Sequence, residues 1–199
     1  MTNCTSVQKL VRVLSLLLLT AIAGSMGAGC SVPWKVVKES GPPSALAGAG
    51  AVVVQFDYSP LRVEGLTQDE WVAKKKEKEA DYDKTWTDLK ARLESTYLAG
   101  FSDVWGAVGR LADGAPKPEN TIVVQVKVNS LEMAHYIPFS SAQSQVTVNV
   151  VWDAKAPDDE IMITGSDQPT LINVSIFQHI GHIGEYLGKV SAKFLQSKQ

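Results

Sequence analysis

The sequence contains few cysteines and few histidines, and it has no hydrophobic run long enough to cross a membrane. Two cysteines and three histidines occur in 199 residues, so a framework of several disulfides is excluded and a metal site would have few ligands to draw on. The apolar run of residues 13–23 is well short of the roughly 20 residues that a transmembrane helix needs. A permanent transmembrane anchor is therefore not expected.

Signatures of catalysis and of nucleic-acid binding are missing as well. The sequence has no G-x-S-x-G motif, and no histidine has a serine or carboxylate context that marks a nucleophile and its base. The formal net charge is -2, and Lys and Arg do not form the basic cluster that phosphate binding requires. We predict a protein that is not an enzyme, binds no nucleic acid and carries no cofactor or metal.

The N-terminal segment has the layout of a secretory signal. Lys9 and Arg12 precede the apolar run, and small residues follow it. A basic end, an apolar middle and small residues are typical of a signal peptide that is removed on export. We predict that residues 1–29 form this signal and that the mature chain begins at Cys30.

The residues Ala28, Gly29 and Cys30 resemble the end of the signal in bacterial lipoprotein precursors. Gly27 departs from the family pattern, which has leucine or a similar apolar residue three places before the cysteine. The resemblance implies that the Cys30 thiol receives a diacylglyceryl group and that acyl chains such as palmitate anchor the protein. Ser31 stands where an aspartate would retain such a protein on the inner membrane, so the resemblance favours the outer membrane, with the domain facing the periplasm.

Cys30 would have no partner for an intramolecular disulfide in the mature chain. The other cysteine, Cys4, lies within the predicted signal, so an exported Cys30 would be a lone thiol. Lipidation accounts for it, and lasting attachment takes more than one acyl chain, because each buried methylene contributes only about 0.8 kcal/mol. The alternative is a plain secretory signal that is cut near Ala28 and leaves Cys30 as an ordinary thiol.

The segment after Cys30 looks like a tether. Residues 30–50 contain three prolines and several glycines, and they show neither a helical nor a strand period. Trp34 would lie either at the membrane interface or against the folded part. The remaining residues, 51–199, are enough for one domain with a substantial core.

The first half of this domain predicts one strand and one long helix. Residues 51–59 are apolar on both faces, as in a central strand. Thr67 and Glu70 form a capping-box pattern, which predicts a helix over residues 68–98 that ends at Gly100. The next stretch, residues 101–118, predicts a short helix or strand followed by a loop.

The second half predicts three strands and a helix. Apolar residues alternate in residues 121–133, 144–154 and 160–167, and the last two strands are expected to form a hairpin. Apolar residues spaced three and four apart predict an amphipathic helix over residues 171–196. The fold class is therefore α/β or α+β, with a mixed sheet of at least four strands, a long helix after the first strand and a C-terminal amphipathic helix.

Two groups of residues on the final helix are candidates for a site. His179 and His182 could share a metal, although the nearest acid, Glu185, is rotated further around the helix; the simpler interpretation is two partly exposed histidines on a packed helix. Three glycines cost stability inside a helix, so they indicate either close packing on a neighbouring element or a surface for self-association. These glycines are Gly181, Gly184 and Gly188.

Two further residues are candidates for a small-ligand site. Asp57 ends the first predicted strand, and strand ends in α/β sheets commonly line crevices. His135 would lie in the connection after the second predicted strand. Together they define the alternative in which the domain binds a small molecule.

The order of elements resembles the small α/β domains of several envelope lipoproteins. The matching features are the strand that ends in "FDYS", the long helix, the strand "VTVNVVWDA" and the C-terminal helix. The group includes the curli secretion-channel lipoprotein and the lipoprotein activators of cell-wall synthases, and the resemblance covers about residues 50–197. It implies a non-enzymatic assembly or regulatory domain that binds another envelope protein. Two alternatives stay open: a pore or ring subunit, which would be a homo-oligomer, and a small-molecule binding protein or enzyme.

Overall fold

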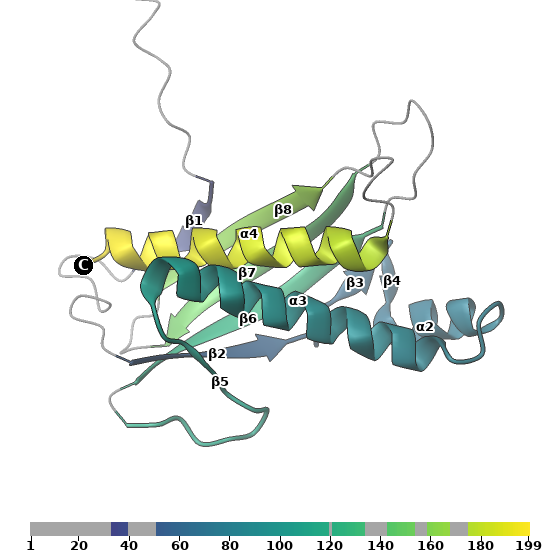
Figure 1. Cartoon of the computed structure of the whole chain (residues 1–199), viewed down its shortest axis with the longest axis horizontal. Coiled ribbons are helices and arrows are strands. Elements are labelled where there is room, and N and C mark those ends of the chain that lie inside the picture. The colour runs from purple at the N-terminus through teal and green to yellow at the C-terminus, as the bar shows by residue number, and fades with distance from the viewer. Residues whose placement is uncertain (1–32, 40–50, 120, 134–142, 154–158, 168–174) are drawn as a thin grey trace, which may run out of the picture. The chain divides into compact units, whose positions relative to one another are not determined.

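A computed structural model describes residues 33–39, 51–119, 121–133, 143–153, 159–167 and 175–199. The described residues from Trp34 onward belong to one compact unit, Trp34–Gln199. Among them, no helix is both long enough and apolar enough to span a bilayer. The unit has two layers, and Figure 1 shows the helices α3 and α4 side by side over one face of a mixed sheet.

The sheet has eight strands, and six of them follow one another in the order β1-β8-β7-β6-β2-β5. The remaining two, β3 and β4, lie off this path. The bounds are β1 Lys35–Lys38, β2 Ala51–Asp57, β3 Arg62–Val63, β4 Leu66–Thr67, β5 Gly109–Arg110, β6 Thr121–Glu132, β7 Ser144–Asp153 and β8 Asp159–Asp167. This architecture confirms the predicted mixed sheet of at least four strands.

The pairing of the strands is parallel on one side of the sheet and antiparallel on the other. β2 runs parallel to β6, with Ala51 opposite Thr121 and Asp57 opposite Lys127. β6 is antiparallel to β7, and β7 is antiparallel to β8. The predicted hairpin of the last two strands is thus confirmed in its pairing, and the parallel pair β2–β6 places the helical segment between them as a crossover.

The core lies between the sheet and the helices, and a bulge shifts its pattern within β6. Alternate residues of each central strand are buried, as the hydrophobic alternation predicts. The register of β6 against β7 shifts between Val128 and Ser130. Val128 and Leu131 are both buried although they are three positions apart, because the extra residue in a bulge reverses the alternation.

A two-residue turn joins β3 to β4. Glu64 has φ 49° and Gly65 has φ 81°, and two successive residues at positive φ are the mark of a type I′ hairpin turn. β3 also pairs in parallel with the end of β6, and the Glu64 N–H donates to the Leu131 carbonyl oxygen at 3.1 Å. The hairpin therefore fixes the chain that follows β2 to the carboxyl end of β6.

The predicted long helix is two helices. α2 spans Gln68–Lys76 and α3 spans Tyr82–Trp105, and the capping box of Thr67 and Glu70 is present. In one continuous helix the Cα atoms of Trp71 and Tyr82 would be about 16 Å apart. The break brings their side chains together, so that Trp71 Nε1 donates to the Tyr82 hydroxyl at 3.3 Å, and both residues are buried.

The prediction that Gly100 ends this helix is wrong. α3 continues through Gly100 to Trp105, and Gly106, with φ 106°, follows as its C-cap. Gly100 is buried in the helix because its missing side chain makes room for α4: a Cβ atom there would lie 2.1 Å from the carbonyl oxygen of Glu185. Residues 101–105 are thus helical, and β5 follows after the cap.

The C-terminal helix α4 spans Ile176–Ser197 and confirms the predicted amphipathic helix. Its buried side includes Ile180, Ile183, Leu187 and Phe194. At the C-terminal end of α4, the Gln196 side chain donates a hydrogen bond to the carbonyl oxygen of Val104 on α3 at 2.8 Å. Its packing on β7, β8 and α3 closes the core.

Part of the predicted tether belongs to the sheet. Residues 35–38 form the edge strand β1, which pairs antiparallel with β8. Trp34 packs against the domain, with its ring centroid 5.6 Å from that of Phe194. The neighbouring Glu39 forms an ion pair with Lys198 at the end of α4. The composition of residues 30–50 hid this strand, because it has only four residues, three of which pair with β8, and all four are exposed.

Candidate functional site

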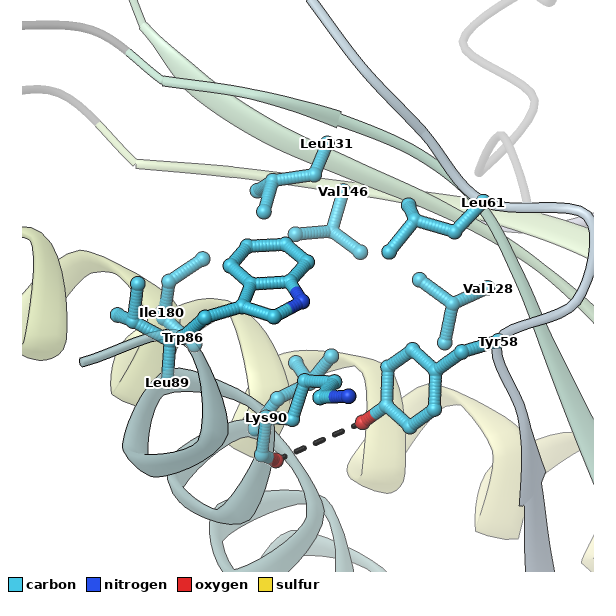
Figure 2. A pocket seen from close by; sticks show the side chains of 10 residues that line it. Tyr58, Leu61, Trp86, Leu89, Lys90, Val128, Leu131, Val146 and Ile180 are labelled. Carbon is cyan, nitrogen blue, oxygen red and sulfur yellow. Dashed lines mark hydrogen bonds between the residues drawn. The ribbon is translucent and has the colours of Figure 1, made fainter. Parts of the chain in front are cut away.

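A largely apolar pocket lies between the sheet and α3, near the carboxyl ends of the parallel strands β2 and β6 (Figure 2). Crevices at the carboxyl ends of strands are the usual ligand positions in open α/β sheets. The pocket is lined by Tyr58, Leu61, Trp86, Leu89, Lys90, Leu93, Val128, Leu131, Val146 and Ile180. Its walls therefore come from the end of β2, the middle of the sheet, α3 and the first turns of α4.

The pocket is narrow. Its cavity volume is only about 20 Å³. Pockets for small molecules usually hold about 300–1,000 Å³. The site therefore has room for one small apolar group, such as the end of an aliphatic side chain, and is too small for a whole small-molecule ligand.

A glutamine holds the two aromatic residues at the rim. The Gln68 side chain accepts a hydrogen bond from Trp86 Nε1 at 3.3 Å and donates one to the Tyr58 carbonyl oxygen at 2.8 Å. Gln68 is the first residue of α2, so the start of this helix fixes both Trp86 on α3 and the backbone after β2. This bridge fixes the rim of the pocket.

Lys90 supplies the charge at this rim. Its ammonium nitrogen lies 5.4 Å from the centroid of the Tyr58 ring and 5.9 Å from that of the Trp86 ring, within the range of cation–π attraction. Figure 2 shows the three side chains around the same opening. The arrangement can therefore bind an apolar group with an adjacent acid, since the apolar part fills the pocket and the acid meets Lys90.

Tyr58 stays a neutral hydroxyl at this site. Burial raises the pKa of Tyr58 well above its ordinary value, and the nearby Glu94 carboxylate raises it further. Glu94 itself pairs with Arg110 on β5, where the Nε–Oε2 distance is 2.8 Å. The neutral phenol donates a hydrogen bond to the Lys90 carbonyl oxygen at 3.5 Å (Figure 2), so it links the chain after β2 to α3 and does not supply a phenolate.

Asp57, one of the two residues of the predicted small-ligand site, does not line this pocket. The Asp57 carboxylate accepts a hydrogen bond from the Ser59 backbone N–H at 2.9 Å, so it caps the turn that follows β2. His135 lies outside the described residues. Tyr58, one residue after Asp57, is the residue at this strand end that lines the pocket.

His179 and His182 share an acid that the sequence analysis did not consider. The Nδ1 atoms of the two histidines lie 2.8 and 3.0 Å from the same oxygen of Asp167, the last residue of β8. His179 is buried, whereas His182 is exposed. In the part of the chain that the structure describes, no three His, Cys, Asp or Glu side chains are arranged to hold a metal ion. The cluster ties the start of α4 to the end of β8.

We expect this cluster to make the stability of the domain pH-dependent. Burial alone would raise the pKa of Asp167, but the hydrogen bonds from His179 and His182 outweigh it and lower the pKa below the ordinary 3.8. A lowered folded-state pKa adds stability above the unfolded-state value, and this stability is lost as the pH falls through the folded-state value. Asp167→Asn should lower the free energy of unfolding by about 2 kcal/mol at pH 6.

Urea unfolding of the wild-type protein and Asp167→Asn between pH 6 and pH 3 measures this effect. The difference between them should shrink below about pH 4, where the wild-type carboxylate becomes protonated. Asp103→Asn serves as the control, because this exposed acid pairs with the exposed Lys189, at 3.4 Å, on the surface of the domain, where an ion pair contributes little. A constant difference at every pH would contradict the expectation.

The three glycines of α4 face α3 of the same chain. A Cβ atom on Gly184 would lie 2.2 Å from Thr96 Oγ1, and one on Gly188 would lie 2.1 Å from the Tyr97 carbonyl oxygen. A Cβ on Gly181 would meet only the Arg92 side chain, at 2.8 Å. Close packing on a neighbouring helix, one of the two expectations for these glycines, is therefore what the structure shows. These glycines therefore lie on the side of α4 that packs against α3.

The last predicted site residue, Cys30, lies outside the described residues. The pocket residues that the sequence analysis missed had weak signals. Trp86 belongs to the predicted apolar face of the helix, Tyr58 follows the predicted strand, and Lys90 is one lysine among many in the charged helical region. Only the packing of α3 on the sheet brings them together.

The comparisons with known proteins give low similarity. No protein-family model matches the chain, and no curated protein matches it. Among solved structures, a PelC dodecamer from Paraburkholderia phytofirmans in space group P6 is 11% identical with a TM-score of 0.44, and the match covers 79% of this chain and 96% of that chain. A variant of this PelC dodecamer in space group C2 is 15% identical with a TM-score of 0.35, over 80% of this chain and 99% of that chain.

A third solved structure comes from another organism. A neuraminyllactose-binding hemagglutinin homologue from Helicobacter pylori is 12% identical with a TM-score of 0.36, and the match covers 80% of this chain and 86% of that chain. These identities and TM-scores are too low to carry an argument about function. The function is therefore argued from the residues of this chain.

Proposed function

We propose that this protein is a lipid-anchored protein of the bacterial cell envelope whose α/β domain is a non-enzymatic interaction module for another envelope protein. The observation that carries the proposal is the N-terminal sequence, in which a basic start and an apolar run lead to small residues and then to Cys30. Ser31 favours the outer membrane, with the domain in the periplasm. The anchor is the acylated Cys30.

The pocket supports the interaction part of the proposal. Its apolar walls, its narrow space and the single cation at its rim suit one side chain of a partner protein and a neighbouring carboxylate. Aromatic residues beside a cation are also frequent at sites that dominate binding energy in protein interfaces. The side chains that line the pocket are suited to binding, and the proposed role of the pocket is therefore to recognise a partner protein.

Cys30→Ser is expected to abolish lipid attachment. In cells fed with a clickable palmitate analogue, the wild-type protein should be labelled and sediment with the outer membrane, whereas Cys30→Ser should be unlabelled and released into the periplasm, because no other thiol remains after signal removal. Cys4→Ser is the matched control, since this residue lies in the predicted signal and its loss should change neither readout. Labelling of Cys30→Ser would contradict the proposal.

The partner is sought with the same pair of proteins. A photo-crosslinking amino acid at Thr87, which lies beside Lys90 on the outer side of α3, should capture a distinct envelope protein in the anchored form and far less of it in Cys30→Ser. The same probe at the exposed Lys193 on α4 is the control. Adducts between copies of this chain would favour the ring subunit instead. An absence of adducts would favour the small-molecule binding protein.

A further inference from the structure

The edge strand β1 begins very close to the predicted lipidation site. Only residues 31–33 separate Cys30 from Trp34, and Trp34 is packed on Phe194 of α4. A fully extended chain gains at most about 3.6 Å per residue, so the Cα atoms of Cys30 and Trp34 can be no more than roughly 14 Å apart. This limit follows from covalent geometry, whatever conformation the connecting residues adopt.

The residues at this edge are suited to a membrane surface. Val36 and Val37 are 45% and 51% exposed, and they are two of the three large hydrophobic residues with high exposure in the described part of the chain. Lys35 and Lys38 flank them and are exposed as well. Apolar side chains beside lysines favour the boundary between anionic headgroups and acyl chains.

The acids near this edge are bound within the protein. Glu39 forms an ion pair with Lys198, and Glu160, opposite Lys38 on β8, accepts a hydrogen bond from the Asn149 side chain at 2.5 Å. The ion pair offsets the charge of Glu39, so that of these two acids only Glu160 opposes the charges of Lys35 and Lys38. An anionic lipid surface would therefore meet a locally basic, partly apolar strand.

We infer that the β1 edge of the sheet is the membrane-facing surface of the domain, in contact with anionic phospholipid headgroups. The inference rests on the proposed lipidation of Cys30 and adds the orientation of the domain. The short covalent connection holds β1 at the bilayer, and its valines and lysines contact it. The opposite edge, β5, follows five strand spacings away in the sheet (Figure 1), or about 24 Å.

This orientation also places the candidate site. The hollow beside Lys90 is lined by residues of α3 together with Arg110 of β5, at the edge that lies away from β1. A partner would therefore reach the rim of the pocket from the periplasmic side and would not have to enter the space between the domain and the bilayer. The hollow beside Lys90 thus extends to the edge of the sheet that is farther from β1, whereas the pocket itself is lined by side chains from the middle of the sheet.

The test uses fluorescence quenching at two positions of the full mature protein. Once Cys30 is acylated, the chain has no other thiol, so Val37→Cys and Ser95→Cys each give a unique position for an NBD label. Val37 is on β1, and Ser95 is an exposed residue of α3 beside Arg110. Both proteins are reconstituted in phosphatidylcholine–phosphatidylglycerol vesicles that contain a headgroup spin label, and acylation of Cys30 is verified by mass in the same samples.

The label at Val37 should lose about half or more of its fluorescence, since the headgroup layer is only several ångströms thick, and the label at Ser95 should be almost unchanged. Adding Lys35→Glu and Lys38→Glu should weaken the quenching at Val37. Equal quenching at both positions in acylated protein would overturn the inference and leave the proposed function intact. The same conclusion would follow if a second copy of the protein covered Val37 and kept the label there from being quenched. An unmodified Cys30 would overturn both.

Discussion

Gly188→Ala is expected to lower the free energy of unfolding by about 3 kcal/mol, which corresponds to a fall in Tm of roughly 6–12 °C for a domain of this size. Alanine would normally stabilise a helix interior by about 1 kcal/mol relative to glycine. Here the new Cβ atom would lie 2.1 Å from the Tyr97 carbonyl oxygen and 2.8 Å from the Phe101 nitrogen. Both are backbone atoms of α3, so the two helices would have to separate.

Gly181→Ala, on the same helix, is the matched control. Its Cβ atom would meet only the Arg92 guanidinium, which is the far end of a flexible side chain and can move away. We expect this variant to be as stable as the wild-type protein or slightly more stable. Thermal unfolding of the two variants measures the contrast, and equal Tm values would contradict the packing of α4 on α3 described above.

Phe194→Ala is expected to cost about 3–5 kcal/mol. Phe194 is 1% exposed, and its ring lies between two tryptophans, with centroid distances of 4.7 Å to Trp152 and 5.6 Å to Trp34. The substitution therefore removes the contact that holds the start of β1 as well as part of the core. Amide hydrogen exchange in residues 34–38 should rise more than the global loss of stability explains.

Phe177→Ala provides the comparison for this second variant. Phe177 is also on α4, but it is only partly buried against the core, so its loss should cost about 1 kcal/mol. Exchange in β1 should then follow the global stability alone. If Phe194→Ala left the exchange of β1 unchanged, Trp34 would not depend on Phe194 for its position.

The strands and the last helix could be predicted from the sequence because their patterns are local. The alternation of apolar residues in 121–128 indicates directly which side chains of β6 face the core. The apolar residues from Ile180 to Phe194 are spaced three and four apart, and this spacing indicates the buried side of α4. Thr67 and Glu70 likewise act within one turn, and their capping box is present. Such signals need no knowledge of what the element packs against.

The errors arose where packing between distant segments decides the structure. Gly100 has the local signature of a helix end, but it remains helical because α4 approaches it closely. The charged residues 74–79 are typical of a helix, yet the helix is interrupted after Lys76. The interruption lets the side chains of Trp71 and Tyr82 form a hydrogen bond. β1 has too few residues to show a period, and only its partner β8 makes it a strand.

The residues that line the pocket could not be predicted from local sequence patterns. The carboxyl end of β2 follows from the strand pattern and from the rule for α/β crevices. The walls of the pocket, however, require α3 to lie over β6 and the bulge to turn Leu131 toward the core beside Val128. Sequence alone therefore selected Asp57, whereas the structure assigns the position to Tyr58.

The pairing of β1 with β8 also has a consequence for the order of folding. β1 is the first strand of the described domain and its partner is the last, and pairs between distant segments form slowly because a long loop must close first. A chain that emerges with its N-terminus first cannot dock β1 until β8 has emerged. Under the proposed lipidation of Cys30, β1 would stay unpaired during that interval, which would leave the nearby cysteine open to acylation before the sheet is completed.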